Sequence, residues 1–147
     1  MTNRVVITGV GAYSPVGNDW GEIEKNLRSR KSGVRHIEAW DEYDGLNTKL
    51  GAPVAHFERP ASFNRKRTRS MGRVALLATA ASESALADAG LLGDPVLQSG
   101  RVGVAYGSST GSTDAITDFA NMLLTKSLDG ITATTYIRMM GHTTPVN

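Results

Sequence analysis

A stripe of alanines between Met71 and Ala89 constrains the fold of this chain more than any other feature. Small apolar residues recur there every three or four positions, which predicts a helix of about five turns that ends at Gly90. The positions on the shared face are Val74, Ala78, Ala81, Ala85 and Ala89. Because alanine projects only a methyl group, another backbone can approach this face closely. The stripe therefore predicts a helix buried inside a layered fold.

The segments around this helix alternate between strand-like and helical patterns. Residues 4–9 open with β-branched side chains and end in glycine, and residues 101–106 form a second apolar run, so both are predicted to be buried strands. Helices are predicted after Asp19 and over residues 114–124, whereas residues 34–64 have poor periodicity and are predicted to be a surface excursion. This order predicts an α/β fold with a mostly parallel sheet and helices on its faces.

The chain is also predicted to be part of a larger domain. Its 147 residues would fit one domain, but residues 132–147 end without a helix-stopping signal or a polar tail. We therefore expect residues 1–147 to be one portion of a domain whose remainder follows them.

Composition excludes several classes of function. The chain has no cysteine, which rules out a disulfide, a thiolate metal site and a cysteine nucleophile within it. Its net charge of +2 is too small to indicate nucleic acid, its three histidines lack metal-ligand spacing, and it shows neither a secretory leader nor a membrane-spanning apolar run. Ser14 stands where a dinucleotide fingerprint needs a third glycine. We expect a cytoplasmic protein with no metal, cofactor, membrane or nucleic-acid partner.

The loop Gly107–Gly111 matches the G-x-S-x-G pattern of a serine nucleophile. The pattern would make Ser109 the nucleophile, His142 its base and Asp129 the orienting carboxylate. Two further hydroxyl residues extend the loop before the next helix, unlike a nucleophile elbow. Hydroxyl residues that cap the helix are the plainer interpretation, and a small serine hydrolase remains an alternative.

Five basic residues gather just before and inside the alanine-striped helix. They are Arg65, Lys66, Arg67, Arg69 and Arg73. Positive charge at a helix N-terminus opposes the helix dipole, which favours a functional reason for the cluster, although a solvated face explains it equally well. Phe63 is the one aromatic residue nearby, so stacking on single-stranded nucleic acid is poorly supported. An acidic protein or a phosphorylated small ligand fits the cluster better.

Six short blocks occur along the chain in the order known from one family. They are RVVITGVG (4–11), KSGV (31–34), SMGRVAL (70–76), ADAGL (87–91), RVGV (101–104) and GSSTGS (107–112). In these blocks the chain resembles the β-ketoacyl-acyl carrier protein synthases, and among them the elongating synthase II type.

The resemblance implies a thiolase-like layered fold and a homodimer that extends fatty acid or polyketide chains by decarboxylative condensation with malonyl-acyl carrier protein. It implies that residues 1–147 are the N-terminal portion of that domain. The family's nucleophilic cysteine, two histidines and lysine would all lie beyond Asn147, so no catalytic residue is expected in this chain. The segment would then supply scaffold, part of the acyl pocket and contacts with the acyl and malonyl carrier proteins.

The resemblance also suggests roles for individual residues. Thr110 matches a family position that borders the acyl pocket, and Thr135 lies near the segment that reaches the pocket of the partner subunit. Lys66 and Arg69 match positions that meet the acidic carrier protein, in agreement with the basic cluster. A catalytically empty relative that binds the carrier protein or an active subunit remains a further alternative.

Two positions depart from the family pattern. Relatives usually read Met-Met-Pro-His-Thr-Thr-Ala-Val-Asn, whereas this chain has Gly141 and Pro145. A proline at position 145 is expected to disturb a helix continuing through it, and with it the dimer-side geometry around His142. We expect His142 to be structural.

Overall fold

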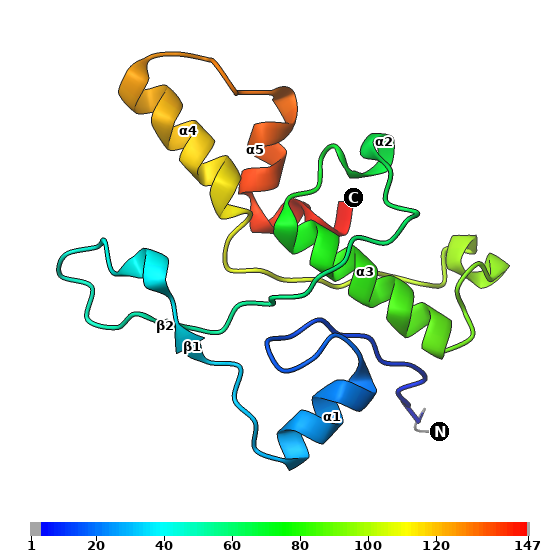
Figure 1. Ribbon diagram of the computed structural model, residues 1–147. Helices are drawn as coiled ribbons and strands as arrows, with labels where there is room; N and C mark the ends of the chain where they lie inside the picture. Colours follow the sequence, from blue (N-terminus) through cyan, green and yellow to red (C-terminus); the bar gives the residue numbers. More distant parts are fainter. Residues whose placement is uncertain (1–3, 147) are drawn as a thin grey trace.

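The computed structural model describes residues 4–146 and centres on one long helix, α3 (Arg73–Asp88), which runs through the middle of the molecule (Figure 1). The helix lies within the predicted range, which confirms that prediction. Gly90 follows it with a φ of +69°, a conformation that glycine adopts without strain. A short 3-10 helix, η2 (Pro95–Gln98), comes next.

The alanine face of α3 is in contact with the backbone of the first segment of the chain. A Cβ atom added to Gly11 would overlap the carbonyl oxygen of Ala81, and one added to Gly9 would overlap that of Ala85. The backbone amide between the two glycines donates to Asp88 Oδ2 at 2.9 Å. The close approach expected from the alanines therefore occurs, with glycine on the opposite side of the contact.

The predicted helix after Asp19 is α1 (Trp20–Arg28). The Asp19 side chain accepts a hydrogen bond from the Glu22 amide at 2.8 Å, and the Glu22 carboxylate accepts one from the Asn18 amide at 3.0 Å. The first bond satisfies a donor that the first helical turn leaves open, and the second joins the residue before the cap to that turn. Ile23 is buried on the apolar face of the helix, although other apolar side chains of that face remain half exposed.

The surface excursion predicted for residues 34–64 contains a small antiparallel pair, β1 (Arg35–His36) with β2 (Leu50–Gly51). A 3-10 turn, η1 (Glu38–Trp40), lies between the two strands, and the unit extends away from α3 (Figure 1). The rest of the excursion is irregular, as the poor periodicity predicted.

The predicted mostly parallel sheet is wrong for the part of the chain that the structure describes. The β1–β2 pair is the single sheet there, and residues 4–9 and 101–106 run extended without a ladder partner. Their apolar side chains are exposed accordingly, with Val5 at 95% and Val104 at 72%. Apolar, β-branched sequence favours an extended backbone, but a sheet also needs neighbouring strands, and none of residues 4–146 supplies them.

The last part of the described chain is helical. Helix α4 (Thr113–Thr125) confirms the helix predicted over residues 114–124, and α5 (Ala133–Met139) packs beside it (Figure 1). A 3-10 helix, η3 (Gly141–Val146), follows. Neither α5 nor η3 was predicted, because β-branched residues dominate the start of this segment and favour strands. The last residue of the predicted segment, Asn147, lies outside the described residues.

The core is small, and most of it lies on α3 and just before it. Its buried hydrophobic residues are Ile23, Phe63, Met71, Ala75, Ala78, Ala80 and Ala115. Most of these are alanines, so close packing of backbones contributes more to this core than large side chains do. In the described range, none of the helices combines the length and apolarity needed to cross a membrane.

We predict that Gly11→Ala lowers the free energy of unfolding by about 1–3 kcal/mol, because the added methyl group would displace the backbone of α3. Gly103→Ala is the matched control, since nothing lies within 4 Å of its added Cβ, and its effect should stay within about 0.5 kcal/mol. Urea unfolding followed by circular dichroism measures both. Equal urea midpoints of unfolding for the two variants would contradict a close contact between Gly11 and the backbone of α3.

A second prediction concerns the two unpaired extended segments. The double variant Ile7→Lys with Val104→Lys should reduce aggregation of the 147-residue chain, because charge protects exposed strand edges. Light scattering against protein concentration measures the effect. Leu124→Lys with Leu128→Lys is the control, because these leucines are comparably exposed but lie outside the extended segments. An equal reduction in both double variants would show that exposed apolar area alone is responsible.

Candidate functional site

The basic cluster of the sequence is built around the short helix α2 (Arg65–Thr68). The Asn64 side chain caps this helix by accepting from the Arg67 amide at 3.0 Å, and the Thr68 hydroxyl donates back to the Asn64 carbonyl at 3.0 Å. Thr68 is buried, whereas Arg65, Lys66 and Arg67 are exposed. Local capping thus holds three cationic side chains on the surface of a single turn.

Two members of the cluster make contacts inside the structure, Arg67 from α2 and Arg73 from the start of α3. Arg67 pairs with Glu83 of α3 at 2.5 Å and lies over the ring of Phe63, 4.8 Å from its centroid. The Arg73 guanidinium donates to the carbonyl of Val54 at 2.6 Å. The charges of Arg67 and Arg73 are therefore committed to structural contacts.

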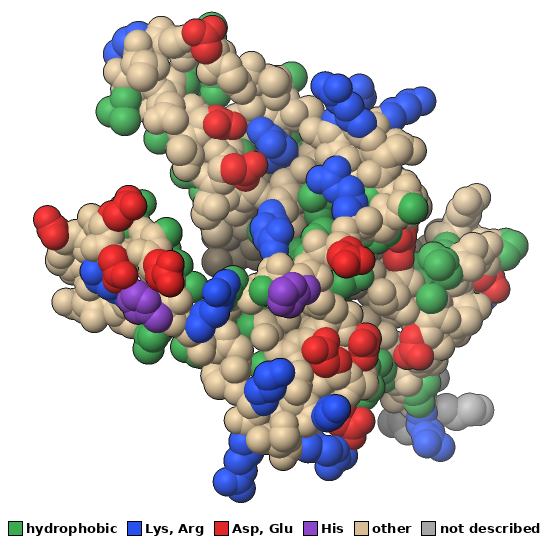
Figure 2. All heavy atoms as spheres, in the orientation of Figure 1, with side chains coloured by type: hydrophobic (Ala, Val, Ile, Leu, Met, Phe, Trp, Pro, Cys, Tyr) green, Lys and Arg blue, Asp and Glu red, His purple; other side chains and the backbone are tan. Residues whose placement is uncertain are grey.

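Lys66 and Arg69 are the members that sequence reasoning singled out, and both are exposed. Lys66 lies on α2 and Arg69 is its C-terminal cap, one helical turn further, so the two project from neighbouring positions. Within residues 4–146 neither has a carboxylate within 4.0 Å. Figure 2 shows several Lys and Arg side chains gathered over α2. The structure thus leaves these two charges available to a partner.

Thr110 lies in the exposed loop that precedes α4, and this loop is attached to the end of α5. The Ser108 hydroxyl donates to the Thr110 carbonyl at 2.6 Å, and the Gly111 amide donates to the Met139 carbonyl at 3.1 Å. A side chain at Gly111 would overlap the Met139 backbone. The position of Thr110 is therefore set by contacts between the loop and α5.

Thr135, in contrast, is almost fully buried, with 1% of its surface exposed. Its hydroxyl accepts from the Thr132 amide at 3.1 Å, and the Thr132 side chain in turn accepts from the Thr135 backbone, which forms a capping box at the start of α5. Thr135 thus fixes where α5 begins.

Across residues 4–146 the alternative serine hydrolase site is not formed. In the described residues, no hydrogen bond links Ser109 to His142 or His142 to Asp129, although a triad requires both. Ser109 and His142 are exposed, and the Asp129 side chain lies in the loop after α4. The match to G-x-S-x-G therefore does not mark a serine nucleophile in this structure. It lies in the loop that leads into α4.

The two departures from the family pattern are accommodated in η3. Gly141 lies beside the loop of Thr110, and a Cβ atom there would come within 2.7 Å of the Ser108 carbonyl oxygen. Pro145 lies inside η3, which is a 3-10 rather than an α-helix. The expectation that proline interrupts regular α-helix is consistent with this geometry.

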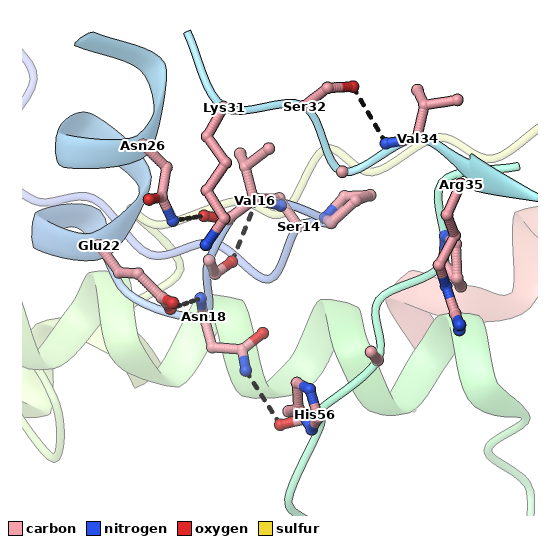
Figure 3. A pocket seen from close by; sticks show the side chains of 15 residues that line it. Ser14, Val16, Asn18, Glu22, Asn26, Lys31, Ser32, Val34, Arg35 and His56 are labelled. Atoms are coloured by element: carbon pink, nitrogen blue, oxygen red, sulfur yellow. Dashed lines mark hydrogen bonds between the residues drawn. The ribbon is translucent and has the colours of Figure 1, made fainter. Parts of the chain in front are cut away.

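A polar cleft of about 470 Å³ that sequence reasoning missed lies between α1, the loop before it and residues 53–56 (Figure 3). The Asn26 side chain donates to the Val16 carbonyl at 2.6 Å, and the Asn18 side chain donates to the His56 carbonyl at 2.9 Å. Figure 3 shows these amides directed at backbone carbonyls of other segments. Their role is to join loops. Over residues 4–146, no three acidic or histidine side chains lie where they could hold a metal ion.

Comparison with known sequences identifies relatives along most of the chain. The family model of the beta-ketoacyl synthase N-terminal domain matches residues 2–144. A 3-oxoacyl-[acyl-carrier-protein] synthase 2 from Synechocystis sp. is 31% identical over 84% of this chain and 29% of its own length. The enzyme of the same name from Vibrio harveyi is 36% identical over 77% of this chain and 27% of its own length.

Solved structures agree with this similarity. A beta-ketoacyl synthase from Burkholderia phymatum is 48% identical and superposes on 99% of this chain with a TM-score of 0.90, over 36% of its own length. The ishigamide ketosynthase/chain length factor, at 24% identity and a TM-score of 0.67, shares the fold over 95% of this chain and 34% of its own. This chain thus spans roughly a quarter to a third of its relatives. The chain belongs to the beta-ketoacyl synthase family, and it corresponds to the N-terminal domain of that family.

Proposed function

We propose that this chain acts as the N-terminal portion of a synthase that elongates fatty acid or polyketide chains by decarboxylative condensation with malonyl-acyl carrier protein. The observation that carries the proposal is the 48% identity to a solved beta-ketoacyl synthase over 99% of the chain. Several relatives are named 3-oxoacyl-acyl carrier protein synthases, and one is named a granaticin polyketide beta-ketoacyl synthase. Both pathways therefore remain within the proposal.

The reactive groups are proposed to belong to a longer polypeptide. Condensation in this family begins with a cysteine that carries the acyl group as a thioester, and this chain contains no cysteine. We place that cysteine, the two histidines and the lysine after Asn147. The part of the reaction left to this chain is to hold the substrate-binding loops and to receive the carrier protein.

The loop of Thr110 is proposed to border the acyl pocket. Its attachment to Met139, together with the fit of Gly141 beneath it, holds the loop in one place. Thr135 is proposed to contribute indirectly, because its capping box sets the start of α5, the segment expected to reach a second subunit. In this proposal Thr135 is a positioning residue, and the protein acts as a homodimer.

Lys66 and Arg69 are proposed to bind the acidic acyl carrier protein in its acyl and malonyl forms. Both cations are exposed and lack a carboxylate neighbour in the described structure, so contact with an acidic surface would not break an existing ion pair. Complementary charge chiefly accelerates encounter and sets orientation, and its effect falls as salt screens it.

The condensation proposal is tested on the longer polypeptide of which we propose this chain to be the N-terminal portion. Incubation with an acyl-carrier protein and malonyl-carrier protein should form a 3-oxoacyl-carrier protein and release carbon dioxide and the free thiol form of the first carrier protein. If no product forms although the polypeptide still binds the carrier protein, the protein is a catalytically empty relative. Absence of both activities would reject the proposal.

We predict that Lys66→Glu with Arg69→Glu weakens binding of acyl carrier protein by about tenfold or more at low salt, because attraction becomes repulsion. Surface plasmon resonance at several salt concentrations measures the dissociation constant and its salt dependence. Lys25→Glu with Arg30→Glu is the control, since these exposed cations lie at α1, away from the cluster. Unchanged affinity in the first variant at low salt would reject docking at this site.

A further inference from the structure

A hollow of about 590 Å³ lies between the end of the surface excursion, α2 and the start of α5. We call it the arginine hollow, because four guanidinium groups line it together with small hydroxyl side chains. Its polar lining includes Arg59, Arg65, Arg69, Arg138, Thr132 and Thr134. No aspartate or glutamate lines it within the described residues. These residues come from two distant parts of the chain, 59–71 and 132–138, so tertiary structure brings the charges together.

Most of this positive charge has no counter-ion. In the part of the chain that the structure describes, Arg59, Arg65 and Arg69 have no carboxylate within 4.0 Å. Other arginines of the same chain are paired closely, for example Arg67 with Glu83 at 2.5 Å and Arg28 with Glu24 at 2.7 Å. Gathering unpaired like charges around one hollow opposes folding unless an anion binds there.

Arg138 is only partly neutralised. Its guanidinium lies 3.5 Å from Asp114 and 3.7 Å from Asp118 on α4, which are long distances for ion pairs. Its Nε atom is buried and has no hydrogen-bond partner in the structure. A buried donor without an acceptor costs free energy, and an anion in the hollow is one group that could supply the acceptor.

From these observations we propose that the arginine hollow is a phosphate-binding site that takes a phosphate ester. A phosphate group carries about −1.5 to −2 charges at neutral pH and three acceptor oxygens, so it can accept from several guanidinium groups at once. The planar donor fork of arginine matches phosphate in a two-bond geometry, which a lysine ammonium cannot reproduce. The hydroxyls of Thr132 and Thr134 add neutral hydrogen-bonding groups on the α5 side.

This site goes beyond the proposed docking surface. Lys66, which we assign to carrier-protein docking, does not line the hollow, and Arg69 is the one residue that the two proposals share. Phosphate binding needs no carrier protein, so it can be measured on its own. The ligand can be free phosphate or a phosphate ester, and separate probes distinguish them.

The experiment titrates the full chain at low ionic strength with inorganic phosphate, glycerol 3-phosphate and acetate, using isothermal titration calorimetry. We expect saturable binding of glycerol 3-phosphate at one site and acetate binding at least about tenfold weaker, because acetate has one charge and two acceptor oxygens. If inorganic phosphate binds more tightly than glycerol 3-phosphate, the proposal that the ligand is a phosphate ester is wrong. Affinity for acetate equal to that for the ester would reject a phosphate site.

Arg59→Gln and Arg65→Gln should each weaken glycerol 3-phosphate binding by about tenfold, because each removes a charged donor. Lys66→Gln is the matched control, since it removes the same charge from the same helix outside the hollow, and it should change the affinity by less than about twofold. An equal loss in the control would indicate diffuse attraction and overturn the proposal.

Nuclear magnetic resonance on the unaltered chain provides a test that does not depend on how variants fold. Glycerol 3-phosphate should shift the backbone amides of Thr132 and Thr134 together with those of α2. Shifts confined to other regions, or none at saturation, would overturn the site. If phosphate binding fails while charge reversal at Lys66 and Arg69 still weakens carrier-protein binding, the hollow is rejected and the docking proposal stands.

Discussion

The contact between the alanine face of α3 and the glycine backbone of the first segment is the constraint on which the rest of the structure depends. Gly9 and Gly11 lie where any Cβ atom would overlap helix carbonyls, so both sides of the contact must be small. This brings the start of the chain against a helix some 70 residues later in the sequence. The α1 region then follows directly from this anchored segment, and α2 precedes α3 at its other end (Figure 1).

The extended segments on either side of this contact explain why the described structure has little sheet. Residues 4–9 and 101–106 are rich in apolar side chains, yet these side chains are exposed, and within residues 4–146 both backbones lack strand partners. Such segments are typical of strands that pair with further parts of a larger domain. The match to about a third of a solved beta-ketoacyl synthase is consistent with this interpretation.

The basic surface divides into groups with different roles. Arg67 binds the Glu83 carboxylate and so attaches α2 to α3, whereas Arg73, at the start of α3, binds the Val54 carbonyl of the surface excursion. Lys66 faces solvent and has no carboxylate within 4.0 Å in residues 4–146, whereas Arg65 and Arg69 line a hollow that they share with Arg138. One stretch of basic sequence therefore serves both internal packing and external binding, and it is the partner of each side chain that separates these roles.

What the sequence determined by itself is mainly local. The range of α3, the capping of α1 by Asp19 and Glu22, and the course of α4 follow from residues within a few positions of one another, whose hydrogen bonds close inside a single turn. Family membership could also be predicted from the sequence, because several short blocks occur in the same order as in the family, and the match to the family model confirms it. The start of α5 was missed because Thr132 and Thr135 form their capping box without the usual acidic residue.

Tertiary structure decided every feature that needs distant residues to meet. Apolar segments predicted a mostly parallel sheet, but pairing depends on neighbours that sequence patterns do not place, and the one sheet within residues 4–146 is antiparallel. The spacing around Ser109 suggested a triad, but among the described residues no hydrogen bond joins Ser109, His142 and Asp129 to one another. The arginine hollow joins Arg138 to residues about 70 positions earlier, so no local pattern could reveal it. Local hydrogen bonds can be inferred from order along the chain, whereas these contacts depend on how the packed backbones bring separate segments together.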